Sequence, residues 1–263
     1  MTELETGSII GREVGKVREG SKVQGVAIGI FCKTPIPGLA KTRLSPPLQP
    51  EDCAALSACF IRDLASTIGE VIRGDDVTAY AVYTPAGSER ELRMLLPNNF
   101  RLQPQCEGDF GTRLATAMRE LLDAGHVGAI MVNADSPTLP ALILRAAVDA
   151  TRRGGVVLSP ALDGGYTLIG LSQLHERLFT DIPWSTSRVH QATVERAAEI
   201  GVPVINVPSW YDIDDAESLA LLQAELAGEP LPFAQAGVRG APAPATRSYL
   251  AARETPLRAK SAR

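Results

Sequence analysis

Short apolar segments alternate with longer amphipathic segments along the central part of the chain. Runs rich in β-branched residues predict strands at 25–31, 78–83, 127–132, 156–159 and 202–207. Apolar residues at helical spacing predict helices at 51–68, 111–123, 139–152, 189–200 and 215–226. The first helix has a clear start, since Pro50, Glu51 and Asp52 suit the amino end of a helix dipole. This alternation predicts an α/β fold, a single domain with a mostly parallel central sheet flanked by helices.

The two ends of the chain lack this pattern. Residues 1–22 are polar and aperiodic, and residues 229–263 are rich in Ala, Pro and Arg. We therefore expect a flexible N-terminal tail at 1–22, a folded domain at 23–228 and a disordered C-terminal tail at 229–263. The basic end of the C-terminal tail either binds an anionic partner or is simply solvated.

Composition narrows the class of protein. A chain of 263 residues with 45% hydrophobic content can bury one large core. The apolar run 127–132 is far shorter than the roughly 20 residues that span a bilayer, and the polar N-terminus does not resemble a signal peptide. We expect a cytoplasmic protein without a membrane partner. The formal net charge of -4 argues against a nucleic-acid partner.

Cysteine and histidine offer little chemistry. Cys32, Cys53, Cys59 and Cys106 form no CxxC pair and have no histidine at zinc-ligand spacing, so we expect reduced and mostly buried thiols. The chain also lacks the G-x-S-x-G turn of a serine hydrolase.

A basic loop follows the first predicted strand. The segment 33–43, KTPIPGLAKTR, carries Lys33, Lys41 and Arg43, and its Gly38 can adopt a positive φ. Lysine and arginine at the end of a strand suit phosphate oxygens, although each cation alone could be an ordinary surface charge. The loop is not a Walker A motif, because Ala40 stands where that motif has glycine before Lys-Thr.

Carboxylates follow two other predicted strands. Asp135 comes after the strand at 127–132, and Asp212 and Asp214 come after the strand at 202–207. Such hard oxygen ligands suit Mg²⁺ or Mn²⁺, which bridges phosphates. Helix capping is the alternative role for this acidic stretch; we assign it to Asp215 and predict Asp135, Asp212 and Asp214 as metal ligands.

Three further segments supply candidate contacts. Gln105, Gly108 and Asp109 precede a predicted helix whose amino end would face the crevice, which suits a nucleotide. The turn Asp163, Gly164, Gly165 and Tyr166 is either a plain turn or a place where an acceptor approaches the backbone. Trp184, Ser185 and Thr186 either contact the acceptor or, for the two hydroxyls, cap a helix.

Six segments in order resemble a known family: KTPIPGLAKTRL, QCEGDFGTRL, NADSPTLP, DGGYTLIGL, WST and YDIDDAESL. They are similar to the CofC-like or rSAM/selenodomain-associated transferases, GT-A-fold proteins related to 2-phospholactate guanylyltransferases. The resemblance implies phosphate contacts by Lys33, Lys41 and Arg43, base contacts near Gln105 and Gly108, and metal ligation by the three aspartates. Those guanylyltransferases have Thr-Asn after the paired glycines, whereas Tyr166 and Thr167 follow here, which argues against a phospholactate-like acceptor.

Three functions fit these features. The first is nucleotidyl transfer from an NTP to a small phosphate- or carboxylate-bearing acceptor, in which Lys41, Arg43 and a metal on Asp135 neutralise developing charge. The second is glycosyl transfer from a nucleotide-sugar. The third is nucleotide binding without catalysis, which the retention of both cations and acids disfavours.

Overall fold

The computed structural model describes residues 24–261 except 47, 75 and 236, so the predicted tail at 1–22 lies outside the described residues. Seven strands form one sheet in the order β3-β2-β1-β4-β6-β5-β7. Their bounds are β1 Gln24–Lys33, β2 Val77–Thr84, β3 Arg101–Pro104, β4 His126–Asn133, β5 Val156–Pro160, β6 Tyr166–Leu171 and β7 Val204–Asn206. Only β6 runs antiparallel to its neighbours. The predicted α/β fold with a mostly parallel sheet is confirmed.

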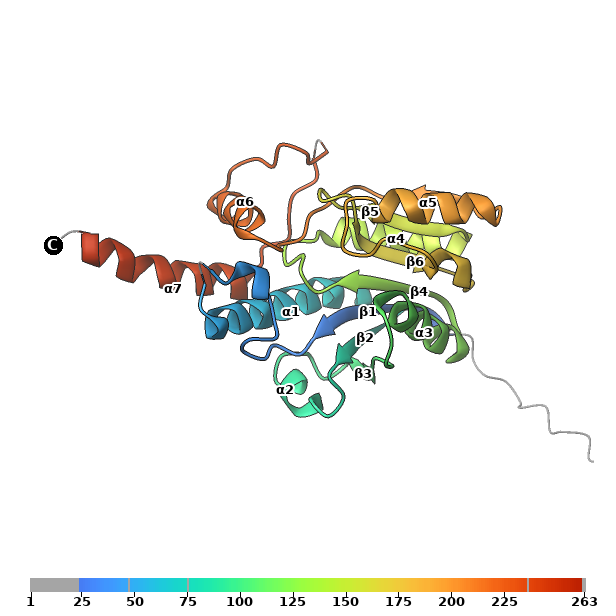
Figure 1. Ribbon diagram of the computed structural model, residues 1–263, viewed down its shortest axis with the longest axis horizontal. Helices are drawn as coiled ribbons and strands as arrows, with labels where there is room; N and C mark the ends of the chain where they lie inside the picture. Colours follow the sequence, from blue (N-terminus) through green and yellow to red (C-terminus); the bar gives the residue numbers. More distant parts are fainter. Residues whose placement is uncertain (1–23, 47, 75, 236, 262–263) are drawn as a thin grey trace, which may run out of the picture.

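Helices cover both faces of the sheet (Figure 1). The helices are α1 Pro50–Ile72, α2 Glu89–Arg93, α3 Phe110–Asp123, α4 Ala141–Arg153, α5 Val189–Glu199, α6 Ala216–Ala227 and α7 Pro244–Ser261, with 3₁₀ turns at Thr42–Leu44 and Glu176–Phe179. Alternate residues of β1 explain the two layers. Val26, Ile28 and Ile30 pack with α1 and α4, whereas Ala27 and Phe31 pack with α3 on the opposite face.

The sheet order brings the carboxyl ends of β1 and β4 together. These strands pair in parallel, with Phe31 opposite Asn133. The segments that leave them therefore start side by side, which is where open α/β sheets bind ligands. The antiparallel hairpin of β5 and β6 then places Tyr166 and the segment before it beside the end of β4.

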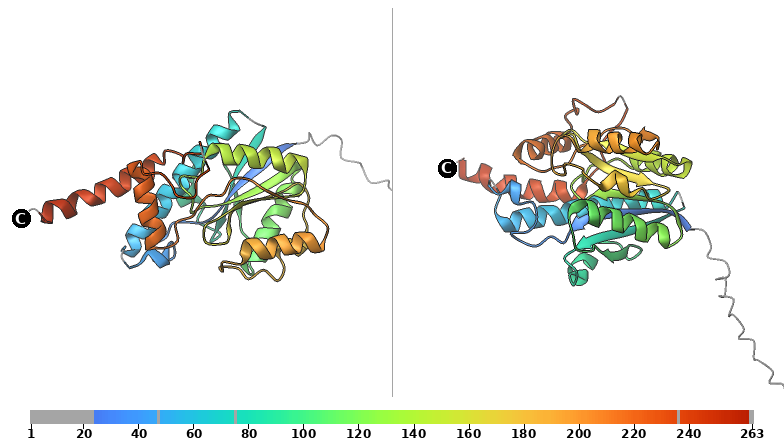
Figure 2. Two further views of the ribbon diagram at one scale, coloured as in Figure 1. Left: turned by 90° about the horizontal axis from the view of Figure 1, so that it is seen from above. Right: turned by 45° about the vertical axis from the view of Figure 1, so that its right-hand side comes forward.

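The C-terminal segment corrects one expectation. Residues 229–263 are not a disordered tail throughout, because α7 lies along α1 and extends past it (Figures 1 and 2). The buried carboxylate of Asp63 accepts hydrogen bonds from the backbone N–H groups of Ala245 and Thr246, at 2.9 and 2.8 Å. A side chain 182 residues upstream of Ala245 thus satisfies the amino end of α7. The segment's composition alone did not reveal this partner.

No helix in the described part of the chain is long and apolar enough to cross a membrane. The predicted burial of most cysteines is confirmed, since Cys32, Cys53 and Cys59 are buried.

Candidate functional site

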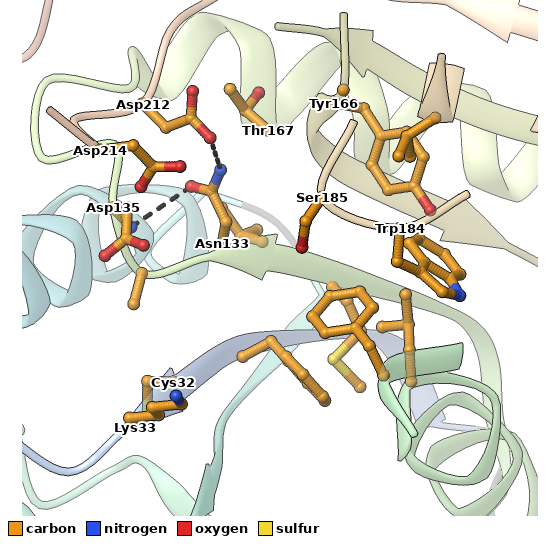
Figure 3. Close-up of a pocket in the computed structure, with 18 of the residues that line it drawn as sticks. Cys32, Lys33, Asn133, Asp135, Tyr166, Thr167, Trp184, Ser185, Asp212 and Asp214 are labelled. Atoms are coloured by element: carbon orange, nitrogen blue, oxygen red, sulfur yellow. Dashed lines mark hydrogen bonds between the residues drawn. The ribbon is translucent and has the colours of Figure 1, made fainter. Parts of the chain in front are cut away.

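A cavity of about 530 Å³ opens at the carboxyl ends of β1 and β4. Most of the predicted site residues line it: Lys33, Lys41, Arg43, Gln105, Asp135, Asp163, Gly165, Tyr166, Trp184, Ser185, Thr186, Asp212 and Asp214. Figure 3 shows the aspartates toward one end and Tyr166 and Trp184 toward the other, with Lys33 below them. Gly38, Gly108, Asp109 and Gly164 were predicted with this set, but they do not line the cavity.

Lys41 connects the basic loop to two of the acids. Its Nζ lies 2.9 Å from Asp135 Oδ2 and 3.1 Å from Asp214 Oδ1, and it also donates to the Ile213 carbonyl. Burial lowers the pKa of Lys41, but the charges of Asp135 and Asp214 outweigh it and raise the pKa overall. Its backbone is left-handed, at φ 51°, which is uncommon for a non-glycine residue. The ammonium is therefore held between carboxylates.

The other two cations of the loop are exposed and can reach a ligand. The Arg43 side chain is 68% exposed, and its Nη1 lies 3.8 Å from Asp214 Oδ2, a long ion pair. Lys33 is exposed at the end of β1. Gly38 has φ 78°, so the predicted positive φ is confirmed. The loop thus presents two exposed charges, Lys33 and Arg43, and one buried charge, Lys41.

Three carboxylates form an acid cluster, which we define as Asp163, Asp212 and Asp214. One ligand atom from each lies within 4.8 Å of the others. Asp135 does not belong to this group, and Asp163, predicted as an acceptor contact, takes its place. Hard oxygen donors at such spacing fit a divalent cation such as Mg²⁺.

Asp212 shows that the acid cluster is short of positive charge. Burial, followed by the charges of Asp163, Asp214 and Asp135, raises the pKa of Asp212 to about 7, and Lys41 only partly opposes this. Asn133 Nδ2 donates to Asp212 Oδ2 at 3.2 Å and holds the carboxylate in place. A cation bound among these carboxylates would relieve their mutual repulsion.

Asp215 begins α6, as predicted. Its carboxylate accepts from the backbone N–H of Ser218 at 2.9 Å, and the Ser218 hydroxyl accepts from the Asp215 N–H at 3.0 Å. This reciprocal pair is a capping box. Asp215 is thus used for capping, whereas Asp212 and Asp214 line the cavity.

Two residues predicted to contact a nucleotide form hydrogen bonds within the fold. Gln105 Nε2 donates to the carbonyls of Cys32 and Val82, and its Oε1 accepts from Arg113. Both amide protons are thus used to join neighbouring strands, so Gln105 is not free to donate to a base edge. Asp109 caps α3, since its carboxylate accepts from the Thr112 N–H at 2.7 Å.

The paired glycines serve the fold of the chain itself. Gly164 has φ 87°, and a Cβ there would lie 2.1 Å from the Ser187 carbonyl oxygen. The close approach expected of an acceptor is thus made by the segment after Trp184. Asp163 Oδ1 accepts from the Gly165 N–H, which closes the turn. Thr186 likewise has a structural role, because its hydroxyl donates to the Pro183 carbonyl.

Aromatic residues complete the cavity at the end opposite the acids. The rings of Phe31 and Phe110 lie 5.4 Å apart, and those of Phe110 and Trp184 lie 4.8 Å apart. We call these three residues the aromatic wall. Sequence reasoning singled out only Trp184, because Phe31 and Phe110 sit in apolar patterns that also describe a core.

Two further lining residues were not predicted as site residues. Arg113 lies over Phe110 at 5.8 Å, and its buried Nε has no hydrogen-bond partner among the described atoms. Cys32 is buried beneath the cavity, where desolvation and the charge of Asp135 raise its pKa to about 12. Cys32 is therefore a neutral thiol and a poor nucleophile.

Comparisons with known proteins support the fold. The family model described as an uncharacterized protein conserved in bacteria (DUF2064) matches residues 67–186, less than half of the chain. No curated protein matches the chain.

Solved structures match over most of the chain. A protein from Desulfovibrio desulfuricans G20, provisionally assigned as a nucleotide-diphospho-sugar transferase, is 24% identical, with a TM-score of 0.74 over 89% of this chain and 96% of that chain. Two matches have a TM-score of 0.50 and 11% identity over 78% of this chain. They are CMP:2-keto-3-deoxy-manno-octonic acid synthetase complexed with CTP, over 99% of its chain, and 4-diphosphocytidyl-2C-methyl-D-erythritol synthase from Anaerococcus prevotii DSM 20548, over 96% of its chain. The chain thus has the fold of the nucleotide-diphospho-sugar transferases.

Proposed function

We propose that this protein is a metal-dependent transferase that uses a nucleotide, and that nucleotidyl transfer is its reaction. One observation carries the proposal: four cations and four carboxylates line a single cavity at the carboxyl ends of parallel strands. They are Lys33, Lys41, Arg43 and Arg113, and Asp135, Asp163, Asp212 and Asp214. A phosphate chain with a divalent cation has charges of both signs, and this arrangement complements it.

Different residues of the cavity bind the phosphates, hold the metal and accept the proton. Lys33 and Arg43 bind the outer phosphates, while Lys41 stays between Asp135 and Asp214 and keeps those carboxylates in place. Mg²⁺ or Mn²⁺ on the acid cluster would neutralise phosphate charge and polarise the phosphoryl oxygens. An acceptor oxygen forms a bond to the α-phosphorus, and the bond from that phosphorus to pyrophosphate breaks. Pyrophosphate leaves with the electron pair, and a carboxylate of the cavity takes the acceptor's proton.

Glycosyl transfer from a nucleotide-sugar is the second candidate, and the aromatic wall favours it. A wall of rings beside an acid cluster suits a donor or acceptor with an apolar ring face. In that reaction the acceptor oxygen attacks the anomeric carbon and a nucleoside diphosphate leaves. The fold similarity to a protein provisionally assigned as a nucleotide-diphospho-sugar transferase supports the same class.

Ligand-dependent melting and product identity test these candidates together. The protein is incubated with each NTP and with nucleotide-sugars, with and without Mg²⁺, and its melting temperature and released products are measured. Ligand at about 100 times its dissociation constant adds about 2.7 kcal/mol to the unfolding free energy. Pyrophosphate from an NTP supports nucleotidyl transfer, whereas a nucleoside diphosphate from a nucleotide-sugar alone supports glycosyl transfer.

The matched variants are Asp212→Asn, in the acid cluster, and Asp123→Asn, at the exposed end of α3. Only the first should remove the metal-dependent part of the melting shift. If no nucleotide shifts the melting temperature with or without Mg²⁺, the proposed function is wrong.

A further inference from the structure

Arg113 is a cation of the cavity lining to which the proposed function gives no role. Under that function Lys33 and Arg43 meet the phosphates of the nucleotide, and Lys41 stays between two carboxylates. The described contacts of Arg113 are a hydrogen bond from Nη1 to Gln105 Oε1, at 2.9 Å, and the ring of a neighbouring phenylalanine. Neither contact is an ion pair, so its positive charge has no partner in the described part of the chain.

One edge of the Arg113 guanidinium forms no hydrogen bond within residues 24–261 as the structure describes them. Nε is buried without a partner, and Nη2, which shares this edge with Nε, forms no hydrogen bond either. A buried N–H group without a partner costs free energy, and a charged one costs more. An oxyanion against this edge would accept from both nitrogens, which is the paired geometry that arginine offers to carboxylates and phosphates.

The surroundings of Arg113 do not balance its charge. The pKa of the Asp109 carboxylate is lowered mainly by hydrogen bonding to Thr112, and the charge of Arg113 is the smallest contribution. That carboxylate caps α3 and is not an ion-pair partner. The rings of Phe110 and Trp184 line the same part of the cavity and supply no negative charge. A cation beside such apolar surface favours a ligand that brings an anion.

Arg113 lies at the aromatic end of the cavity. Its guanidinium carbon is 5.8 Å from the centre of the Phe110 ring, and that ring is 4.8 Å from Trp184. Figure 3 shows Trp184 away from the aspartates, where the metal and the phosphates of the nucleotide would bind. A nucleobase is uncharged at neutral pH and would leave the charge of Arg113 unbalanced. The anion at this end therefore belongs to the acceptor.

Resting on the proposed function, we propose that Arg113 binds a carboxylate or phosphate of the acceptor and that the apolar body of the acceptor lies against Phe110 and Trp184. Phe110 is 38% exposed although it begins a helix, where a polar residue would be tolerated. An exposed ring beside an unpaired guanidinium suits a ligand with an apolar face and an anionic end.

The anion that pairs with Arg113 anchors the acceptor and is not the attacking group. A separate oxygen of the acceptor, nearer the acid cluster, forms the bond to the α-phosphorus. Pyrophosphate leaves with the electron pair, and a carboxylate of the cavity takes the proton of the attacking oxygen. Arg113 is thus a positioning and specificity residue in this reaction.

Binding of four small probes to the full chain tests this subsite without relying on turnover. Benzoate and phenyl phosphate carry a ring and an anion, benzyl alcohol carries the ring alone, and acetate carries the anion alone. Dissociation constants are measured by ligand-observed NMR titration without added metal, so that no probe binds through Mg²⁺ at the acid cluster. We expect benzoate or phenyl phosphate to bind at least tenfold more tightly than benzyl alcohol and acetate.

Variants of Arg113 separate recognition of charge from a role in shaping the cavity. Arg113→Gln should weaken the tighter of the two ring-bearing anions at least tenfold and leave benzyl alcohol within about twofold. Arg113→Lys keeps the charge without the paired donors, so the weakening should be smaller, about threefold. Arg101→Gln is the matched control, because Arg101 also lies 5.8 Å from a ring, that of Tyr80, and donates one hydrogen bond to a side chain, but does not line this cavity.

Two further variants locate the anion within the cavity. Phe110→Ala should weaken both ring-bearing anions and benzyl alcohol, each about tenfold. Arg43→Gln, at the phosphate end, should leave the ring-bearing anions unchanged while it weakens an NTP. Melting temperatures establish which variants are folded. If Arg113→Gln is not, Arg113→Lys and the order of the four probes still decide.

The remaining outcomes overturn the inference. They are an anion that binds no more tightly than benzyl alcohol or acetate, equal weakening of anion and alcohol by Arg113→Gln, and equal weakening of the anion by Arg101→Gln. If an NTP displaces the anion and Arg113→Gln weakens that NTP by the same factor, Arg113 binds the nucleotide and the inference is wrong. Failure of the proposed function looks different, because nucleotides would then fail to bind while the anion still bound and still depended on Arg113.

Discussion

The acid cluster and the aromatic wall lie at opposite ends of one cavity and are held in place by different forces. At the charged end, Lys41 joins Asp135 to Asp214, and Asn133 holds Asp212 through hydrogen bonding. At the aromatic end, position depends on close packing, as where Trp184 lies over Gly111. The charged end should therefore respond to substitutions that keep shape and change charge, and the aromatic end to substitutions that change shape alone.

Removing the charge of Lys41 should have the largest effect. Lys41→Met keeps most of the side-chain length but leaves Asp135 and Asp214 without their shared cation. We expect turnover to fall on the order of 10²- to 10³-fold, because the carboxylates would repel each other and the phosphates. The unfolding free energy at pH 8 should fall by about 1–3 kcal/mol, less than for a fully buried pair because both carboxylates are partly exposed.

Urea unfolding and initial rates measure both effects, and Lys33→Met, on the exposed end of the loop, is the matched control for the loss of unfolding free energy. The raised pKa of Lys41 means that its ion pairs contribute stability at neutral pH and lose it only as pH rises through that value. Equal loss of unfolding free energy in the two variants would contradict the distinct role of Lys41.

Neutralising Asp212 should lower turnover but raise the stability of the metal-free protein at pH 8. The pKa of Asp212 is about 7 in the fold, against an ordinary value of 3.8, so the folded state favours the protonated form. The metal-free protein should then lose stability as pH rises from about 4 to about 7, with the full penalty above that. Asp212→Asn removes the charge that the folded state disfavours, so the unfolding free energy at pH 8 should rise. We expect a rise of about 1–3 kcal/mol, a range lowered to allow for the partial exposure of the side chain.

The same variant should lose turnover by about 10²-fold and lose its melting shift with Mg²⁺. Unfolding at pH 8 and at pH 4 provides the measurement, since the stability gain should vanish at pH 4. A variant that is less stable than the parent at pH 8 would show that the carboxylates of the acid cluster do not repel each other.

The sequence predicted the parts of the fold that follow a regular pattern. Strands such as β1 and β4 are short apolar runs, and five helices show amphipathic spacing, so both kinds of element were located. β3, with the sequence RLQP, was missed because a run of four residues with one aliphatic side chain is too short to indicate a strand. Helix α7 was missed because its amino end depends on Asp63, a contact distant in the sequence.

The site was predictable where residues follow strand ends. Lys41, Asp135 and Asp214 were expected in one crevice, and they meet there. The partners of Gln105 were not predictable, because the carbonyls of Cys32 and Val82 belong to two other strands. The aromatic wall was largely missed because an exposed aromatic ring and a core aromatic ring have the same sequence pattern.

Adding one methyl group at Gly111 tests whether close packing holds the aromatic end of the cavity. In Gly111→Ala, the new Cβ would meet the Phe179 carbonyl oxygen and the Trp184 indole, and backbone cannot move as easily as a flexible side chain. We expect a loss of about 1–3 kcal/mol in unfolding free energy from this overpacking. The Mg²⁺-dependent melting shift at the acid cluster should persist, because Gly111 lies at the other end of the cavity.

Gly69→Ala supplies the matched control, since Gly69 lies inside α1 and its nearest contact to a new Cβ is Arg73 Nη1 at 4.0 Å. Alanine is the better helix former there, so the same added methyl should stabilise the protein by about 0.5–1 kcal/mol. Opposite signs in the two variants would show that Gly111 is required by the ring above it. If Gly111→Ala instead left stability unchanged, close packing would not hold Trp184, and the contrast between the two ends of the cavity would fail.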